Sequence, residues 1–155
     1  MSITASEVDL KAGELVAIRQ AFGPTFAELA ASDPRLVAVT ADLGGSVNLA
    51  TWGHDNPKRY FNCGVAECDM IGIAAGLAMT GWLPFAITFG SFLGRAMDHV
   101  RQSIGHNRLK VNVVGSHGGI SNGKANIRLP GSWSLGSSRR WIRTLALGYR
   151  RVTSA

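Results

Sequence analysis

Glu67 is the residue of this sequence whose type and surroundings most clearly suggest chemistry. It begins a run of apolar and small residues that extends to Thr80. An acid in the first turn of a helix is favoured by the helix dipole, by about 0.3–1 kcal/mol, whatever its function. A carboxyl group in apolar surroundings also keeps a proton more readily, which suits it to share one with a ligand nitrogen. Taken alone, this local pattern favours the purely structural role.

Phosphate and metal motifs are missing or defective. No two glycines stand two positions apart, so the dinucleotide-binding pattern Gly-x-Gly is absent. Segment 118–125 comes close to a P-loop, but Ala125 stands where Ser or Thr would hold magnesium. The four histidines lack metal-ligand spacing, and Cys63 and Cys68 lack the companion ligands of a zinc site. We expect no metal site and no disulfide, and only His117, which follows a predicted strand, remains a candidate histidine.

Short β-branched runs alternate with helical segments along the first four-fifths of the chain. The expected strands are 35–40, 59–62, 83–88 and 110–115. The expected helices are 14–32, 66–80 and 92–104. This alternation predicts an α/β fold, a parallel sheet with helices on both faces. Ligands bind such sheets outside the carboxyl ends of the strands, so we expect the site in the loops after residues 41, 62, 88 and 115.

A charge-free stretch, 70–94, is long enough to cross a bilayer. Thr80-Gly81-Trp82-Leu83-Pro84 interrupts it, so two shorter buried elements joined by a turn explain it better. The N-terminal residues carry early acids and no apolar signal region. We therefore expect no membrane span and a cytoplasmic protein.

The net charge of +6 is concentrated in one segment. Residues 125–155 contain six arginines, no lysine and no acid, whereas the remaining ten basic residues balance ten acidic ones. Trp133, Trp141 and Tyr149 lie among these arginines, which would suit a non-catalytic protein that binds nucleic acid or anionic surfaces. The neutral body argues against that alternative. At 155 residues the chain fits one domain, and we expect at most a short basic helix over 141–149.

Four segments together resemble one protein family, and they lie in that family's order. They are Ala-Asp-Leu-Gly-Gly-Ser at 41–46, Arg-Tyr-Phe-Asn-Cys-Gly-Val-Ala-Glu at 59–67 with Ala-Ala-Gly-Leu-Ala at 74–78, Thr-Phe-Gly-Ser-Phe-Leu-Gly-Arg-Ala-Met-Asp at 88–98, and Gly-Ser-His-Gly-Gly-Ile-Ser at 115–121. The set resembles the pyrimidine-binding domain of transketolases. The 88–98 segment is most similar to the deoxyxylulose-phosphate synthase and split-transketolase branch.

The resemblance implies a thiamine diphosphate-binding fold and assigns roles to residues of this chain. Glu67 matches the glutamate that bonds to N1′ of the thiamine aminopyrimidine, which activates C2 of the thiazolium ring. Phe89 and Phe92 match the aromatic residues around the pyrimidine; otherwise they would be core residues. Arg95 matches an arginine near the glutamate; otherwise it would be an exposed helix residue.

Three further residues match positions along the cofactor and substrate region. Asp42 and Ser46 match the lining of the cofactor and the substrate phosphate, and otherwise they would be a turn residue and a helix cap. His117 matches a histidine that contacts the substrate phosphate.

The resemblance runs from residue 14 to residue 124 and then stops. We expect a 1–13 extension, a partial pyrimidine-binding domain over 14–124, incomplete at its C-terminus, and an Arg-rich divergent tail over 125–155. The family's acidic turn ending in Thr-His is replaced after Lys124, which indicates a truncated or frame-disrupted chain that the encoding nucleotide sequence would reveal.

The family's metal-binding Gly-Asp-Gly…Asn motif is also missing, since no Gly-Asp pair occurs. The missing motif implies that a partner subunit binds the diphosphate and Mg²⁺, that this chain holds only the pyrimidine half of the cofactor, and that it is inactive alone. The resemblance itself implies two-carbon ketol transfer between phosphorylated sugars in a dimer or heterotetramer. Nucleic acid and membrane are not expected partners.

Overall fold

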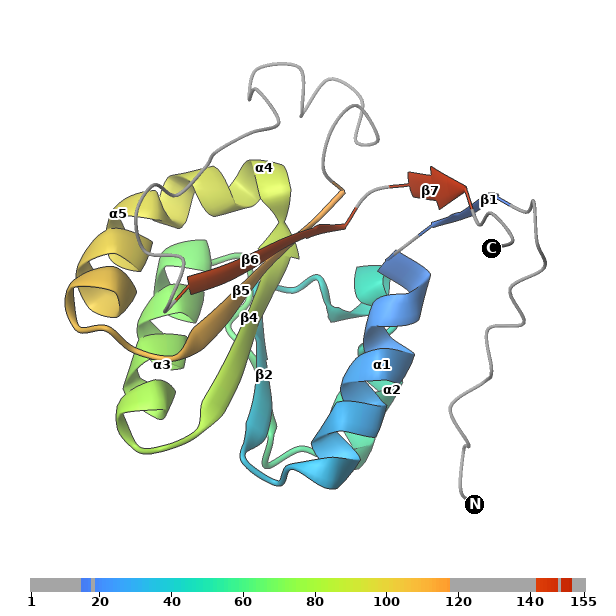
Figure 1. The fold of residues 1–155 in the computed structure, drawn as a ribbon, viewed down its shortest axis with the longest axis horizontal. Helices are drawn as coiled ribbons and strands as arrows, with labels where there is room; N and C mark the ends of the chain where they lie inside the picture. The colour runs from blue at the N-terminus through green and yellow to red at the C-terminus, as the bar shows by residue number, and fades with distance from the viewer. Residues whose placement is uncertain (1–14, 18, 118–141, 148, 152–155) are drawn as a thin grey trace.

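The computed structural model describes residues 15–17, 19–117, 142–147 and 149–151. Its centre is a five-stranded sheet of order β3-β2-β4-β5-β6, in which all neighbouring strands run parallel. The strands are β2 (Leu36–Thr40), β3 (Tyr60–Asn62), β4 (Leu83–Phe89), β5 (Val111–Ser116) and β6 (Ile142–Leu147). A separate antiparallel pair joins β1 (Leu15–Ala17) to β7 (Tyr149–Arg151) (Figure 1).

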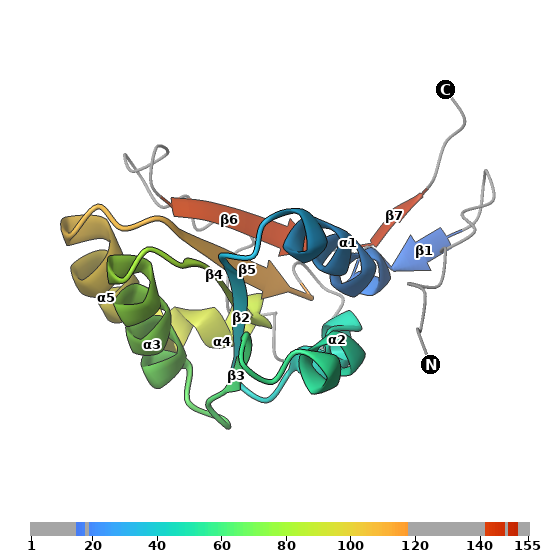
Figure 2. The ribbon, with the colours of Figure 1, turned by 90° about the horizontal axis from the view of Figure 1, so that it is seen from below.

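Helices cover both faces of the sheet, as the sequence predicts (Figure 2). One face carries α1 (Arg19–Ser32), η1 (Gly44–Val47) and α2 (Ala50–Asp55). The other carries α3 (Glu67–Met79) and a helical run made of α4 (Gly90–Leu93), η2 (Gly94–Ala96), α5 (Met97–His99) and η3 (Val100–His106).

Successive residues of the central strands point into two different cores. In β2, Val39 packs with the α3 side, whereas Leu36 and Ala38 pack with Phe26 of α1 on the other side. Side chains of a strand alternate between its faces, so a strand covered on both faces must be apolar throughout. This explains the continuous apolar runs of the sequence.

Helix α1 continues through Pro24 because another segment satisfies the carbonyl group that proline leaves unbonded. Proline has no N–H, so the carbonyl of Gln20, four residues earlier, lacks its helical partner. Asn48 Nδ2 donates to that oxygen at 3.2 Å. The neighbouring Gly23 makes the approach possible, since a Cβ there would lie 2.0 Å from the Asn48 oxygen.

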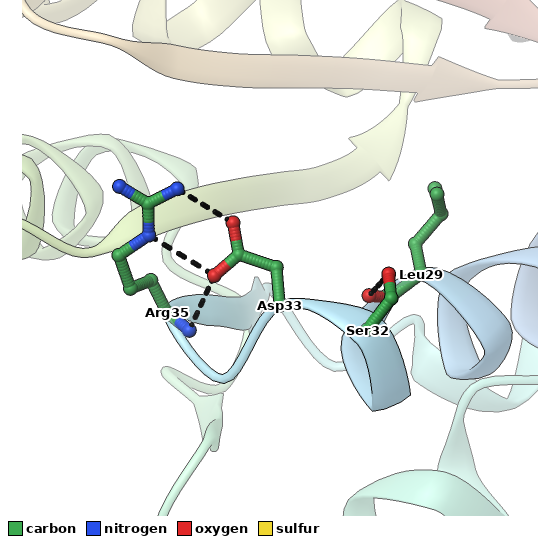
Figure 3. A network of polar contacts seen from close by, with 4 residues as sticks. All are labelled: Leu29, Ser32, Asp33 and Arg35. Atoms are coloured by element: carbon green, nitrogen blue, oxygen red, sulfur yellow. Dashed lines mark hydrogen bonds and ion pairs between the residues drawn. The ribbon is translucent and has the colours of Figure 1, made fainter.

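Polar contacts fix the turn from α1 into β2 (Figure 3). The Ser32 hydroxyl donates to the Leu29 carbonyl at 2.8 Å, which caps the end of the helix. Arg35 donates from Nε and Nη2 to the two carboxylate oxygens of Asp33, at 3.0 and 2.7 Å. These side-chain hydrogen bonds lower the pKa of Asp33 to about 2.

The structure confirms most of the predicted elements and corrects two of them. The charge-free stretch consists of α3 and β4 joined by a turn, and no helix in the described ranges is long and apolar enough to span a membrane. The helix predicted from residue 14 begins only at Arg19, after β1. The short helix expected over 141–149 is wrong, because Ile142–Leu147 forms β6 and satisfies the backbone of the β5 edge. The P-loop-like segment after His117 lies outside the described residues.

Candidate functional site

Glu67 is a buried acid at the first position of α3. It is 1% exposed, and the next residues of its helix face, Met70, Ile71 and Ala74, are fully buried. Its Oε2 accepts a hydrogen bond from Arg95 Nη1 at 3.0 Å. Its Oε1 is also buried and has no hydrogen-bond partner within the described part of the chain. A buried carboxylate oxygen normally has a donor, so this atom is a place where a ligand donor fits.

A row of aromatic contacts extends from Arg95 across the carboxyl ends of β4 and β5. The Arg95 guanidinium lies over the ring of Phe92, 5.3 Å from its centroid. The Phe92 and Phe89 rings are stacked with centroids 5.3 Å apart, and the Phe89 centroid lies 4.1 Å from that of His117. Five predicted site residues therefore form one continuous series from Glu67 to His117.

His117 follows β5 and is held in a left-handed conformation, with φ of 55°. Its Nδ1 lies 3.0 Å from the hydroxyl of Ser116, which is fully buried. Burial, and then the positive charge of Arg19, lower the pKa of His117 from its ordinary value of 6.5. The imidazole is therefore predominantly neutral at pH 7.

Arg19 joins the site although its position in the sequence gives no signal. Its Nη1 donates to the backbone oxygen of Ser46 at 3.5 Å, while its Nε is buried without a partner in the described ranges. Ser46 lies in η1, within the loop after β2, and is half-buried. Arg19 opens a helix rather than following a strand, so the rule that points to the carboxyl ends of strands does not find it.

Asp42 lies in the same loop and is bound to the end of β3. Its backbone N–H donates to Asn62 Oδ1, and its Oδ1 accepts from Asn62 Nδ2, both at 3.1 Å. Asn62 Oδ1 also accepts the backbone N–H of Gly64 at 3.0 Å. Sequence reasoning misses Asn62 as a site residue, although it is the last residue of a predicted strand.

The described cysteines and acidic residues do not form a metal site. Among the described residues there is no group of three His, Cys, Asp or Glu side chains that could hold a metal ion. Cys63 and Cys68 are free cysteines, both half-buried. Cys68 Sγ donates to the Arg95 backbone oxygen at 3.4 Å, and burial raises the pKa of the Cys63 thiol.

The arrangement offers three chemical functions at one edge of the sheet. Glu67 provides a buried carboxylate oxygen for which the described residues supply no donor, and Phe89 and Phe92 provide an aromatic surface for a planar ring. Arg19, beside Ser46 and His117, provides positive charge that suits an anionic group.

Comparisons with family models and with individual proteins point to the same family. The family model of the transketolase pyrimidine-binding domain matches residues 14–126. A putative transketolase C-terminal section of Methanocaldococcus jannaschii is 43% identical over 108 residues, which are 69% of this chain and 34% of that protein. One subunit of the apulose-4-phosphate transketolase of Phocaeicola vulgatus is 35% identical over 113 residues, 72% of this chain and 36% of that protein.

A solved structure has the same fold. The split gene transketolase, an inactive β4 tetramer, aligns with a TM-score of 0.60 and 39% identity over 68% of this chain and 35% of that chain. This chain thus spans about a third of the length of these relatives. The family match covers well over half of the chain and includes every predicted site residue. The chain belongs to the transketolase family, as a pyrimidine-binding domain.

Proposed function

We propose that this chain is the pyrimidine-binding part of a split, thiamine diphosphate-dependent transketolase that transfers a two-carbon ketol unit between phosphorylated sugars. The observation that carries the proposal is the carboxylate of Glu67. One of its oxygens is held by Arg95, and the other is buried without a donor in the described ranges. A ring nitrogen that shares a proton with Oε1 would satisfy this atom.

The residues of the site fit an aminopyrimidine ring. When bound, thiamine diphosphate supplies a thiazolium carbon that can attack a sugar carbonyl. Glu67 Oε1 would hold the proton shared with N1′ of the ring. Phe89 and Phe92 would pack against the ring, and their apolar surface would exclude water from that proton. Arg95 would keep the carboxylate in place from the other side.

The opposite end of the site would receive the substrate. Asp42 and Ser46 would line the region between cofactor and substrate phosphate. Arg19 would supply the positive charge for that phosphate, because the arginine guanidinium is a cation whose N–H groups suit phosphate oxygens. His117, which is mostly neutral at pH 7, would contribute a hydrogen bond rather than a charge.

A partner subunit would complete the site. The chain has no Gly-Asp pair, so we assign the diphosphate and Mg²⁺ to that partner, in a dimer or heterotetramer. The relatives named as a transketolase subunit and as a C-terminal section support this division. Val65 lies in the turn before α3 and is 73% exposed, while Ile73 within α3 and Met79 at its end are 40% and 72% exposed. Exposed apolar side chains along the helix that begins with Glu67 suit contact with that partner.

We also propose the division into a 1–13 extension, a 14–124 domain and a 125–155 tail, and a cytoplasmic location. Two parts of that tail, β6 and β7, pair with strands of the body. Their place in these sheets supports a structural contribution of the tail.

Reconstitution tests the proposed function. The purified chain is mixed with the diphosphate-binding subunit of a split transketolase, thiamine diphosphate and Mg²⁺, and ketol transfer between sugar phosphates is measured. We expect no turnover by the chain alone, turnover in the mixture, and none with Glu67→Ala. Turnover by the chain alone would contradict the division of the site, and full turnover by Glu67→Ala would contradict the role of Glu67.

A further inference from the structure

Asn62 connects two loops that carry proposed site residues. It is the last residue of β3, at the edge of the sheet, and its neighbour β2 ends at Thr40, just before Asp42. One side-chain amide makes three hydrogen bonds here. Oδ1 accepts the backbone N–H groups of Asp42 and Gly64, and Nδ2 donates to Asp42 Oδ1.

The orientation of this amide follows from its partners. Both groups that face Oδ1 are N–H donors, and the group that faces Nδ2 is a carboxylate oxygen, which only accepts. The reversed amide would place its NH₂ group against two donors and its oxygen against an anion. Only an amide provides an acceptor and a donor at these two places.

The bonds hold one backbone conformation that the chain does not favour by itself, at Asp42, and they also bind the glycine turn at Gly64. Asp42 has φ of 61°, a left-handed conformation that is unfavourable for a residue with a Cβ. Its backbone N–H and its carboxylate are both bound by Asn62, and this holds the turn in place. Gly64, with φ of 68°, forms the turn that leads into Glu67.

We propose that Asn62 is a positioning residue that fixes the Asp42 carboxylate relative to the turn that delivers Glu67. Asn62 itself would not touch the cofactor. Its hydrogen bond occupies Asp42 Oδ1, so Oδ2 becomes the oxygen that Asp42 presents to a ligand. The catalytic meaning of this arrangement rests on the proposed function, whereas the positioning itself does not.

Hydrogen exchange of the full chain tests the positioning directly. In Asn62→Ala, we expect the Asp42 and Gly64 amides to exchange about fivefold faster, because each loses its acceptor. The Cys63 N–H, which donates to Thr40 O, and the Ala38 N–H, which donates to Arg59 O, belong to the adjoining backbone and serve as internal controls. Their exchange rates should stay unchanged. Unchanged exchange at both Asp42 and Gly64 would overturn the proposal.

A second variant separates the two functions of the amide. Asn62→Asp keeps an acceptor for the Gly64 N–H but replaces the donor to Asp42 with a negative charge. We expect wild-type exchange at Gly64 and displacement of the Asp42 side chain, seen as altered chemical shifts of its carboxyl carbon. A Gly64 amide that exchanges as fast as in Asn62→Ala would show that Oδ1 is not its acceptor and would overturn the proposal.

Turnover after reconstitution with the diphosphate-binding subunit tests the catalytic consequence. We expect Asn62→Ala and Asn62→Asp to lower kcat about tenfold, through misplacement of Asp42. Asn107→Ala, at an exposed asparagine outside the site that bonds to Gln102 and Ser103 carbonyls, is the matched control and should retain kcat. If the wild-type mixture is inactive, the proposed function fails and the exchange data alone decide about Asn62. If it is active and both variants keep full kcat, the positioning role is wrong.

Discussion

Arg95 Nη1 donates a hydrogen bond to Glu67 Oε2 at 3.0 Å, and the two side chains differ greatly in exposure. The arginine side chain is 54% exposed, whereas the glutamate side chain is 1% exposed. Because the guanidinium also lies over Phe92, it is held on one side of the carboxylate. The pair therefore orients Glu67 and leaves Oε1 buried without a donor in the described part of the chain, where the proposed ligand would bind.

Removing Arg95 should destabilise the chain through Glu67. In Arg95→Met, the buried carboxylate loses the guanidinium that donates to Oε2, and we expect a loss of about 1–2 kcal/mol in the free energy of unfolding. The loss stays moderate because solvent screens the exposed side of the pair. Urea unfolding measures it, with Arg101→Met as the control, since Arg101 and its partner Asp98 are both exposed. Equal losses in the two variants would refute the special position of Arg95.

Gly23 should tolerate no side chain. A Cβ at this position would lie 2.0 Å from the Asn48 oxygen and 2.4 Å from its carbonyl carbon, both backbone atoms. We expect Gly23→Ala to lower the free energy of unfolding by about 1–3 kcal/mol or more, measured by urea unfolding. Gly72→Ala is the matched control within α3, where nothing lies within 4 Å of the added Cβ, and it should stabilise by up to about 1 kcal/mol. A stabilising Gly23→Ala would contradict the close approach of α1 and η1.

The sequence is sufficient for the parallel sheet and for the edge at which the site lies. Short apolar runs with β-branched residues identify the central strands, and the strand-end rule locates Asp42, Phe89 and His117. Asn62 satisfies the same rule, but its proposed role depends on three hydrogen bonds that no local pattern reveals. Two of them join Asn62 to Asp42, 20 positions away in the sequence, and one accepts the backbone N–H of Gly64.

Other features depend on tertiary contacts alone. Arg19 reaches Ser46 over 27 positions of sequence, so no spacing rule could connect the two residues. Residues 142–147 carry a basic, mixed pattern, but the edge of β5 decides their conformation and makes them a strand. Pro24 suggests a kink, whereas the Asn48 side chain compensates for the missing N–H.

The imidazole of His117 should titrate with a pKa below its ordinary value of 6.5. Burial and the Arg19 charge lower its pKa from 6.5, so the folded chain binds this proton less readily than the unfolded chain. The stability that this lowered pKa contributes to the folded chain is fully present above pH 6.5 and is lost as the pH falls through the pKa of folded His117. NMR titration of the imidazole measures the value, and Arg19→Met should move it upward.

Lys58 offers the matched control for this titration. It lies in the turn between α2 and β3, before the amino end of β3, whereas His117 follows the carboxyl end of β5. Lys58→Met removes one positive charge, as Arg19→Met does, and should leave the pKa of His117 unchanged. A pKa of His117 above 6.5 in the wild-type chain would contradict the structure.

Asp33 should contribute to stability in a defined range of pH. Its pKa is about 2 in the folded chain against an ordinary 3.8, because Arg35 donates hydrogen bonds to the carboxylate. A lowered pKa gives stability that is present above pH 3.8 and is lost as the pH falls toward 2. Asp33→Asn should therefore lower Tm slightly at pH 7, and this effect should shrink as the pH falls from 3.8 through about 2. Asp55→Asn, at an exposed acid at the end of α2, provides the comparison. If the Tm difference between Asp33→Asn and the wild-type chain stays constant over this range of pH, the ionised Asp33 carboxylate is not the source of the stabilisation.

The most direct measurement is the exchange of the thiazolium C2 proton of thiamine diphosphate with deuterated solvent in the reconstituted enzyme. Glu67→Gln preserves the size and a hydrogen-bonding atom of the side chain but removes the group that shares the proton with the pyrimidine. We predict that Glu67→Gln slows this exchange by about a hundredfold or more, while the cofactor remains bound. Exchange at the wild-type rate in Glu67→Gln, with the cofactor bound, would contradict the role of Glu67 and with it the proposed function of the chain.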